Sequence, residues 1–506
     1  MLIQNRNLTL AKSIWGFCLA FGILSRFWNI TNIGISGSDA FFYWQTAYEW
    51  AFQKIQLNEH YRPFVYSIYA LALKVFGAND WPIKLMNVIY DLLAGLMTYK
   101  VYVTYFKDKM GAITASSIYL ILPTFIMWSR LEEVHTPSIL FILCSLYFFH
   151  PSIHQRRWYN FFLSGMFLSF AWNTHPDLAV LVPVFLLFLF IFNGGDFYDI
   201  ATFGLIFLLG VFSVFIAFSF IVSPAELLVN IVSNHSAQKN PVTDAWIIKF
   251  FTVYYRYISE NLSPLITLIF TIVFISSFVK KSYRSINSLF LISLVLFYCL
   301  MCSLLFSRVY LARLLLPLCP VILIVCINFA LQFKKFKYYL LLLVGVASIY
   351  PHTSTIFSPY TQEFSYYKQL DEFIGKEVNS ENKILIAPFI FYHIHSPLHK
   401  NIYLNGNGIY IPLDEGNSFK EIVEKNHVTY FVWAKKLHDH RIFGINIKSK
   451  YIEKIRNVYR MEPGQYSVEK DQAFFNQQLR ELGAIQIADN QLGTFYKIIK
   501  NSKEDK

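Results

Sequence analysis

The stretch SRFWNITNIGISGSDAFFYW, residues 25–44, joins the end of a long apolar run to the start of an amphipathic one. The apolar run is long enough to cross a bilayer, so Asp39 falls at the boundary between membrane and water. The residues that follow place an apolar face at helical spacing: Phe41, Trp44, Ala47, Tyr48, Ala51 and Ile55. The stretch therefore predicts a spanning helix, a carboxylate at the membrane surface, and a helix that lies along that surface.

The composition of the whole chain agrees with a membrane protein. Of its 506 residues, 55% are hydrophobic, 18% aromatic and only 15% charged, and the mean hydropathy is +0.40. A soluble domain rarely carries so little charge. The net charge of +12 would also suit a nucleic-acid-binding protein, but much of the basic excess lies in short clusters between apolar runs. We therefore expect membrane lipids among its partners and no nucleic acid.

Apolar runs of bilayer-crossing length predict about eleven membrane spans. They lie near 11–30, 84–105, 111–128, 134–149, 160–174, 178–193, 200–222, 262–279, 286–306, 311–332 and 338–357. Basic clusters fall on alternate loops: Arg6/Lys12, Lys107/Lys109, Arg156/Arg157, Lys280/Lys281/Arg284 and Lys334/Lys335/Lys337. Because such clusters stay in the cytoplasm, we predict a cytoplasmic N-terminus and outer loops that hold Asp39, Glu132 and His175. The richness in Phe, Ile and Asn indicates a low-GC bacterium, and hence its plasma membrane.

One apolar segment does not fit the span count. Residues 62–77 read as a helix with proline near the start and glycine at the end. If this segment crossed the membrane, every later basic cluster would lie outside the cell. We therefore expect it to form, with residues 39–56, a pair of juxtamembrane helices on the outer surface.

The composition changes from about residue 358, where charged residues become frequent. Apolar runs shorten to strand length at 383–387 and 428–433, and helical patterns appear at 367–378 and 419–426. Alternating strand and helix signals are typical of an α/β domain. We predict a transmembrane module over 1–357 and a small extracytoplasmic α/β domain over 358–506.

An acidic residue also lies inside a predicted span. Asp91 falls in the apolar run 84–105, where an ionised carboxylate typically costs about 2.5–3.5 kcal/mol. We therefore expect Asp91 to face the helix bundle and to have a partner there or to be protonated.

The polar residues follow a definite order along the chain. They are Arg26, Asp39, an Arg-Pro helix that ends Val75-Phe76-Gly77, Pro82-Ile83-Lys84-Leu85, Ser129-Arg130-Leu131-Glu132-Glu133 and Tyr310-Leu311-Ala312-Arg313-Leu314-Leu315-Leu316-Pro317. Over residues 10–330 this order resembles the integral-membrane GT-C glycosyltransferases. It most resembles family 39, the protein mannosyltransferases and aminoarabinose transferases, with the bacterial galacturonosyltransferase-like branch. The resemblance implies a polytopic α-helical GT-C-like fold, here with about 11 spans and two juxtamembrane helices.

Asp39 matches the first-loop catalytic aspartate of that family. Such a carboxylate takes a proton from the acceptor hydroxyl as it attacks the anomeric carbon. Alternatively, Asp39 or Ser38 could simply cap the following helix, and the two roles are compatible. The family often has a second acidic residue directly after this aspartate, and here the position is Ala40.

The remaining candidates follow from the resemblance. Glu132 and Glu133 lie where the family has a second acidic group, which would bind or orient the acceptor with help from His135; the alternative is a solvated loop. Arg313 matches an arginine at the outer start of a late span, and Arg308 lies nearby. Arginines suit a sugar-phosphate but also extend toward lipid headgroups. His175 replaces a lysine common in related enzymes, and could contact the phosphate when protonated or belong to an ordinary Pro-containing turn.

The resemblance implies an inverting hexosyl- or pentosyl-type transferase with a polyprenyl-phosphate-linked sugar as donor. The acceptor could be lipid A or lipopolysaccharide, another surface glycan or a protein. No nucleotide-binding motif is present, and nothing in the sequence requires a divalent metal. The alternatives are a transporter or flippase, or a polymerase or ligase, for a lipid-linked glycan. A transporter typically places its polar residues near the bilayer midplane, whereas these candidates gather at the outer boundary.

Overall fold

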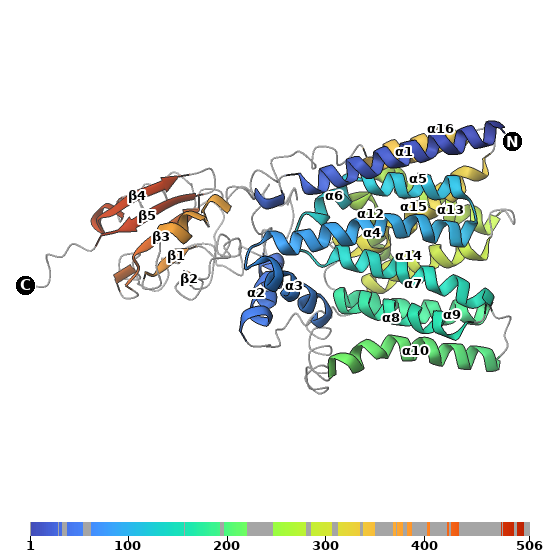
Figure 1. Ribbon diagram of the computed structural model, residues 1–506, viewed down its shortest axis with the longest axis horizontal. Helices are drawn as coiled ribbons and strands as arrows, with labels where there is room; N and C mark the ends of the chain where they lie inside the picture. Colours follow the sequence, from blue (N-terminus) through green and yellow to red (C-terminus); the bar gives the residue numbers. More distant parts are fainter. Residues whose placement is uncertain are drawn as a thin grey trace, which may run out of the picture. The chain divides into compact units, whose positions relative to one another are not determined.

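The computed structural model describes residues 2–28, 30–32, 38–53, 62–155, 157–192, 197–219, 246–279, 285–305, 312–333, 337–349, 368–370, 372–377, 382–386, 402–404, 423–424, 427–434, 477, 479–489 and 493–499. The chain separates into two compact units. One contains residues 1–30 and 46–357, and the other contains 31–45 and 358–506. The first is helical and the second contains a β-sheet (Figure 1).

The α-helices are α1 Leu2–Phe27, α2 Ser38–Phe52, α3 Pro63–Phe76, α4 Trp81–Phe106, α5 Lys109–Ile121, α6 Pro123–Ser129, α7 His135–Gln155, α8 Trp158–Thr174, α9 Val182–Phe192, α10 Phe197–Ser219, α12 Trp246–Asn261, α13 Pro264–Val279, α14 Ile286–Leu305, α15 Cys319–Gln332 and α16 Lys337–Ile349. Three 3₁₀ helices accompany them: η1 Ile30–Asn32, η2 Pro176–Leu181 and η4 Ala312–Leu318. Long helices of the first unit pack side by side in the order α1, α5, α4, α7, α8 and α10 (Figure 1). A contiguous apolar core of buried side chains runs through this unit.

Within the described residues, each predicted apolar run contains a helix or two consecutive helical segments, and residues 220–222 and 350–357 of two runs lie outside the described part. By length and composition, four helices of the described part can each cross a membrane: Thr9–Phe27, Tyr198–Ala217, Ile286–Leu304 and Arg313–Gln332. A fifth candidate is the pair α5 and α6, which is bent by 55°. The bend lies at Leu122, which is extended because the next residue is Pro123. The chain is thus a helical membrane protein, and the full number of spans remains a prediction.

The two expected helices are present as α2 and α3, and their position at the membrane surface stays a prediction. Residues 54–56 of the first predicted helix lie outside the described part of the chain. Helix α3 starts with Pro63 at its first turn and ends before Gly77. Trp50 of α2 packs edge-on against Tyr66 of α3, with ring centroids 5.7 Å apart. The buried face of α2 has the predicted spacing, although it is turned slightly from the predicted one and consists of Ala40, Tyr43, Trp44, Thr46, Ala47, Trp50 and Ala51.

Helices α8 and α10 approach each other closely because each offers a glycine at the contact. A Cβ atom on Gly165 of α8 would meet the carbonyl oxygen of Phe207. In the same way, a Cβ atom on Gly210 of α10 would meet the carbonyl oxygen of Phe162. Small residues of this kind let helix backbones pack tightly in membranes. This contact holds α8, whose C-terminal end carries His175.

The second unit contains a five-stranded sheet in the order β2-β1-β3-β5-β4. Its strands are β1 Ile384–Ile386, β2 Ile402–Leu404, β3 Tyr430–Ala434, β4 Ala484–Asp489 and β5 Gly493–Ile498. Strand β1 is parallel to β2 and β3, whereas β5 is antiparallel to β3 and β4. The two predicted strands are confirmed as β1 and β3, and residues 368–370 and 372–377 of the predicted helix are helical. The ammonium group of Lys368 donates a hydrogen bond to the carbonyl oxygen of Thr31.

Candidate functional site

Three polar residues of α4 build the interior of the site. Lys84, Asn87 and Asp91 lie three and four residues apart, which places them on one face of the helix. All three are fully buried. Because a buried polar group needs a hydrogen-bond or ionic partner, each of them binds another part of the chain. Lys84 and Asn87 bind the loop before α7, and Asp91 binds α1 and α5.

Asp91 is paired with Arg26, which confirms the prediction that it has a partner. The carboxylate accepts from the guanidinium Nε of Arg26 at 2.5 Å and from the hydroxyl of Tyr119 at 2.5 Å. Arg26 also donates to the backbone oxygens of Gly22 at 3.0 Å and Leu120 at 2.6 Å. This cluster therefore joins α1, α4 and α5.

Lys84 holds the loop between α6 and α7 through Glu132. Its ammonium group lies 2.8 Å from the carboxylate of Asp80 and 3.0 Å from that of Glu132. The Glu132 side chain is 0% exposed. Burial raises the pKa of the Glu132 carboxyl, although the charge of Lys84 acts in the opposite direction. Two carboxylates thus share one lysine, and Glu132 is enclosed by protein.

Asn87 fixes the backbone of the same loop. Its amide nitrogen donates to the carbonyl oxygens of Leu131 at 2.7 Å and Glu133 at 2.8 Å. The hydroxyl of Tyr69 in α3 donates to the amide oxygen of Asn87 at 2.7 Å. The backbone around Glu133 is therefore held from two helices, which limits where its side chain can reach.

The side chain of Glu133 meets Arg313 of η4. The Glu133 Oε1 and Arg313 Nη1 atoms are 3.5 Å apart, and the Arg313 side chain is 27% exposed. Helix η4 is itself fixed, since the hydroxyl of Tyr298 donates to the carbonyl oxygen of Leu314 at 2.8 Å. A guanidinium that is partly exposed and held by a carboxylate can also bind an anion.

Two histidines lie beside this pair. The rings of His135 and His175 have their centroids 5.2 Å apart, and His135 Nε2 lies 3.9 Å from Glu133 Oε2. Burial, together with the charges of Arg62 and Arg313, lowers the pKa of His175 to about 3. His175 is thus neutral at ordinary pH, so any contact with a phosphate would be through a neutral ring. Arg62 also donates to the carbonyl oxygen of Thr174 at 2.9 Å.

The structure brings Glu133, Arg313 and His175 together, and their roles stay predictions. It excludes the alternative of a solvated loop, because Glu132 is 0% and Glu133 only 5% exposed. Asp39 is the second residue of α2, but its side chain lies outside the described part of the chain, and so does Arg308. The roles of these two residues remain predictions.

Sequence reasoning did not single out Lys84, Asn87 and Tyr69 as residues that build the site. The spacing of Lys84, Asn87 and Asp91 within one apolar run was the available signal, because polar residues on one face of a spanning helix point to a polar interior. Nothing comparable marks Tyr69, whose role depends on how α3 packs against α4.

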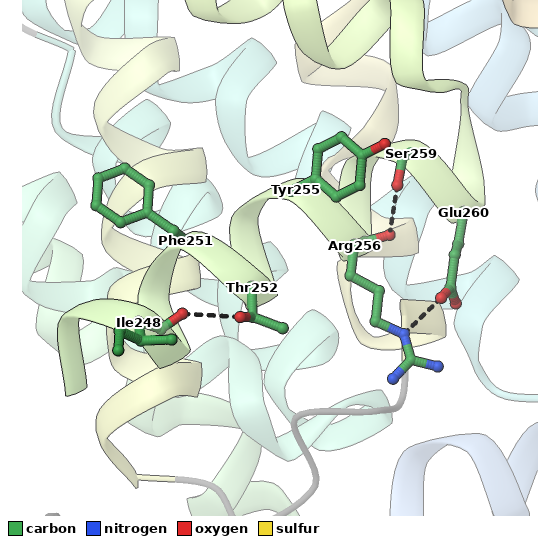
Figure 2. Close-up of a pocket in the computed structure, with 7 residues that line it drawn as sticks. All are labelled: Ile248, Phe251, Thr252, Tyr255, Arg256, Ser259 and Glu260. Carbon is green, nitrogen blue, oxygen red and sulfur yellow. Dashed lines mark hydrogen bonds and ion pairs between the residues drawn. The ribbon is translucent and has the colours of Figure 1, made fainter. Parts of the chain in front are cut away.

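A surface hollow of about 560 Å³ lies elsewhere, along the outer face of α12 (Figure 2). Its lining residues all belong to that helix: Ile248, Phe251, Thr252, Tyr255, Arg256, Ser259 and Glu260. Arg256 and Glu260 form an ion pair there at 2.5 Å. None of the candidate residues lines this hollow. Among the described residues, no group of three or more His, Cys, Asp and Glu side chains is placed to hold a metal ion.

Comparison with known proteins supports the resemblance. Residues 61–222 match the family described as dolichyl-phosphate-mannose-protein mannosyltransferase. An uncharacterized protein of Aquifex aeolicus is 24% identical over 138 residues. That match spans 27% of this chain and 27% of the relative.

Solved structures extend the similarity along the chain. ArnT from Cupriavidus metallidurans, solved with undecaprenyl phosphate, is 11% identical, has a TM-score of 0.57, and is aligned over 96% of this chain and 98% of that one. The oligosaccharyltransferase AglB from Archaeoglobus fulgidus, solved with an inhibitory peptide and a dolichol-phosphate, is 12% identical with a TM-score of 0.54. It is aligned over 84% of this chain and 69% of its own. The chain thus shares the fold of ArnT and AglB, and its residues 61–222 resemble the mannosyltransferase family.

Proposed function

We propose that the protein transfers one sugar from a polyprenyl-phosphate donor to an acceptor at the outer face of the bacterial plasma membrane. The observation that carries this proposal is the placement of Arg313 against Glu133, 3.5 Å apart, beside Arg62 and His175 in a GT-C fold. The two arginines can bind the donor phosphate, and the carboxylate of Glu133 can accept a hydrogen bond from a hydroxyl group of the acceptor. Two proteins of this fold, ArnT and AglB, were solved with a polyprenyl-type phosphate.

Arg313 is proposed to hold the donor phosphate, with Arg62 as a second cation. Negative charge grows on the phosphate oxygen as the bond to the anomeric carbon breaks, so a fixed guanidinium stabilises the transition state more than the ground state. The planar donors of arginine match phosphate oxygens. The products are a polyprenyl phosphate and the glycosylated acceptor.

Asp39 is proposed as the base. It would take the proton of the acceptor hydroxyl while that oxygen attacks the anomeric carbon from the side opposite the phosphate, which inverts the configuration. Of the two glutamates, Glu133 is the better candidate for orienting the acceptor, because Glu132 is fully buried against Lys84. The acceptor is a cell-envelope glycolipid such as lipid A, another surface glycan, or a protein.

The test is transfer by the full chain, purified and returned to lipid. Radiolabelled undecaprenyl-phosphate sugars are supplied with extracted envelope glycolipids, and products are identified by mass spectrometry. Asp39→Asn should abolish transfer, whereas Glu49→Gln, which removes a carboxylate from the same helix, should not. Full activity of a folded Asp39→Asn protein would overturn the role of Asp39. Movement of the lipid-linked sugar across liposomes without any transfer would favour the flippase alternative.

A further inference from the structure

The two histidines near Arg313 have hydrogen-bonding capacity that the described protein does not use. His135 begins α7 and is 4% exposed, and His175 ends α8 and is 2% exposed. Neither Nδ1 atom has a hydrogen-bond partner among the described residues. Since buried polar atoms nearly always find a partner, these two nitrogens point to a ligand.

The protonation state of the histidines limits which chemical groups of a ligand they can bind. A neutral imidazole offers one donor and one acceptor, which matches a hydroxyl group, itself both donor and acceptor. A phosphate offers only acceptors and is better served by Arg313 and Arg62. Burial and the neighbouring arginines hold the pKa of His175 at about 3, which keeps this ring neutral.

The charges of Arg62 and Arg313 act on both histidines, but we assign these arginines to the donor phosphate. The groups that lie against the rings themselves include two carboxylates, which disfavour a second anion. Glu133 Oε2 lies 3.9 Å from His135, and the Asp177 carboxylate lies 3.8 Å from His175 Nδ1. Trp128 packs edge-on against His135 with a centroid distance of 5.2 Å. A carboxylate-bearing sugar placed here would face two carboxylates, whereas a neutral sugar would meet hydroxyl-binding and aromatic groups.

We propose that His135 and His175 bind hydroxyl groups of the transferred sugar, and that this sugar carries no carboxylate. The inference rests on the proposed function, since the sugar of a polyprenyl-phosphate donor is bonded directly to the phosphate that Arg313 would hold. The histidines act as specificity-determining residues for a neutral hexose or pentose.

The experiment compares lipids that differ only in the sugar. The full chain in detergent is titrated with undecaprenyl phosphate, with its neutral hexose derivatives (gluco, galacto and manno), and with its glucuronate and galacturonate derivatives. At least one neutral derivative should bind about tenfold more tightly than undecaprenyl phosphate, a difference that one or two added hydrogen bonds can supply. The uronate derivatives should show no such gain.

Variants of the histidines test whether these residues cause the tighter binding of the neutral-sugar lipid, which is called the gain below. His135→Phe and His175→Phe keep a ring but remove the nitrogens, so each should reduce the gain to within about twofold. His150→Phe is the matched control, since His150 is also buried in α7 but lies about 22 Å farther along the helix. It should leave the gain unchanged. His135→Asn, which retains a donor and an acceptor, should recover part of it.

The outcomes separate the inference from the proposed function. A wild-type protein that binds none of these lipids would overturn the proposed function. Three results would overturn the role of the histidines alone. The protein could bind undecaprenyl phosphate but no neutral-sugar lipid more tightly, or it could prefer a uronate lipid. The tighter binding of the neutral-sugar lipid could also persist in both phenylalanine variants. The comparison of neutral with uronate lipids needs only the wild-type protein, so it holds even if a variant does not fold.

Discussion

Arg26→Met should destabilise the helical unit by about 3–5 kcal/mol, because it leaves the buried carboxylate of Asp91 without its cation. The Arg26 and Asp91 side chains are 0% and 1% exposed and lie 2.5 Å apart, so water cannot replace the lost partner. The variant also loses hydrogen bonds to Gly22 and Leu120. Of the described residues that donate to Asp91, the Tyr119 hydroxyl would remain.

The double variant Arg26→Met/Asp91→Leu isolates the cause. Removing both charges together should recover most of the loss, since replacing a buried ion pair with apolar residues is often neutral or even stabilising. The assay is the free energy of unfolding of the full chain in detergent, from a denaturant titration followed by tryptophan fluorescence. A loss under about 1 kcal/mol in Arg26→Met, or a double variant no more stable than the single one, would refute the pairing as a buried contact.

Three further predictions follow from the same structure. Arg313→Gln should lower kcat/KM for sugar transfer by about 100-fold or more, because the donor phosphate loses its stabilising cation. Arg256→Gln, which removes a cation from the surface ion pair of α12, should leave kcat/KM near that of the wild type. Equal effects of the two substitutions would contradict phosphate binding by Arg313. Because the pKa of His175 falls to about 3 from 6.5 on folding, the unfolded chain binds a proton that the folded chain does not. Stability should thus be complete above about pH 6.5 and fall by about 1.4 kcal/mol per pH unit toward pH 3. Denaturant titrations should show a shallower slope in His175→Asn, and an unchanged slope would exclude this histidine as the cause. Gly165→Leu should destabilise the protein by about 1–3 kcal/mol, because the new side chain cannot fit between α8 and α10, and its unfolding midpoint should fall. Gly16→Leu should have little effect, because the space at the Gly16 Cβ position is open. Equal midpoints of the two variants would contradict close packing of α8 against α10.

The two glutamates show how adjacent residues acquire different roles. Glu132 points toward Lys84, with a separation of 3.0 Å, and Glu133 toward Arg313, with a separation of 3.5 Å. Adjacent side chains in this loop point in different directions. One carboxylate can therefore fix the loop to Lys84, while the other contacts Arg313. From sequence alone the two were equivalent.

The positions of the helices and of strands β1 and β3 could be predicted from local sequence. In a bilayer every backbone polar group must be satisfied within the segment, so a sufficiently long apolar run has little choice except a helix. The helix breaks at Pro63, Gly77 and Pro123 also follow from the conformations these residues allow or forbid. These helices, strands and helix ends depend on residues that are close in sequence, so they can be predicted from local sequence.

The pairings within the site depended on tertiary structure. Arg26 meets Asp91 across 65 residues, Asn87 meets Glu133 across 46, and Glu133 meets Arg313 across 180. The sequence determined that these polar groups lie in or near the membrane and need partners, since leaving them unpaired there costs free energy. It did not determine which partner each one takes, because that choice depends on the order in which α1, α4, α7 and η4 pack together, and many packings satisfy the same apolar pattern.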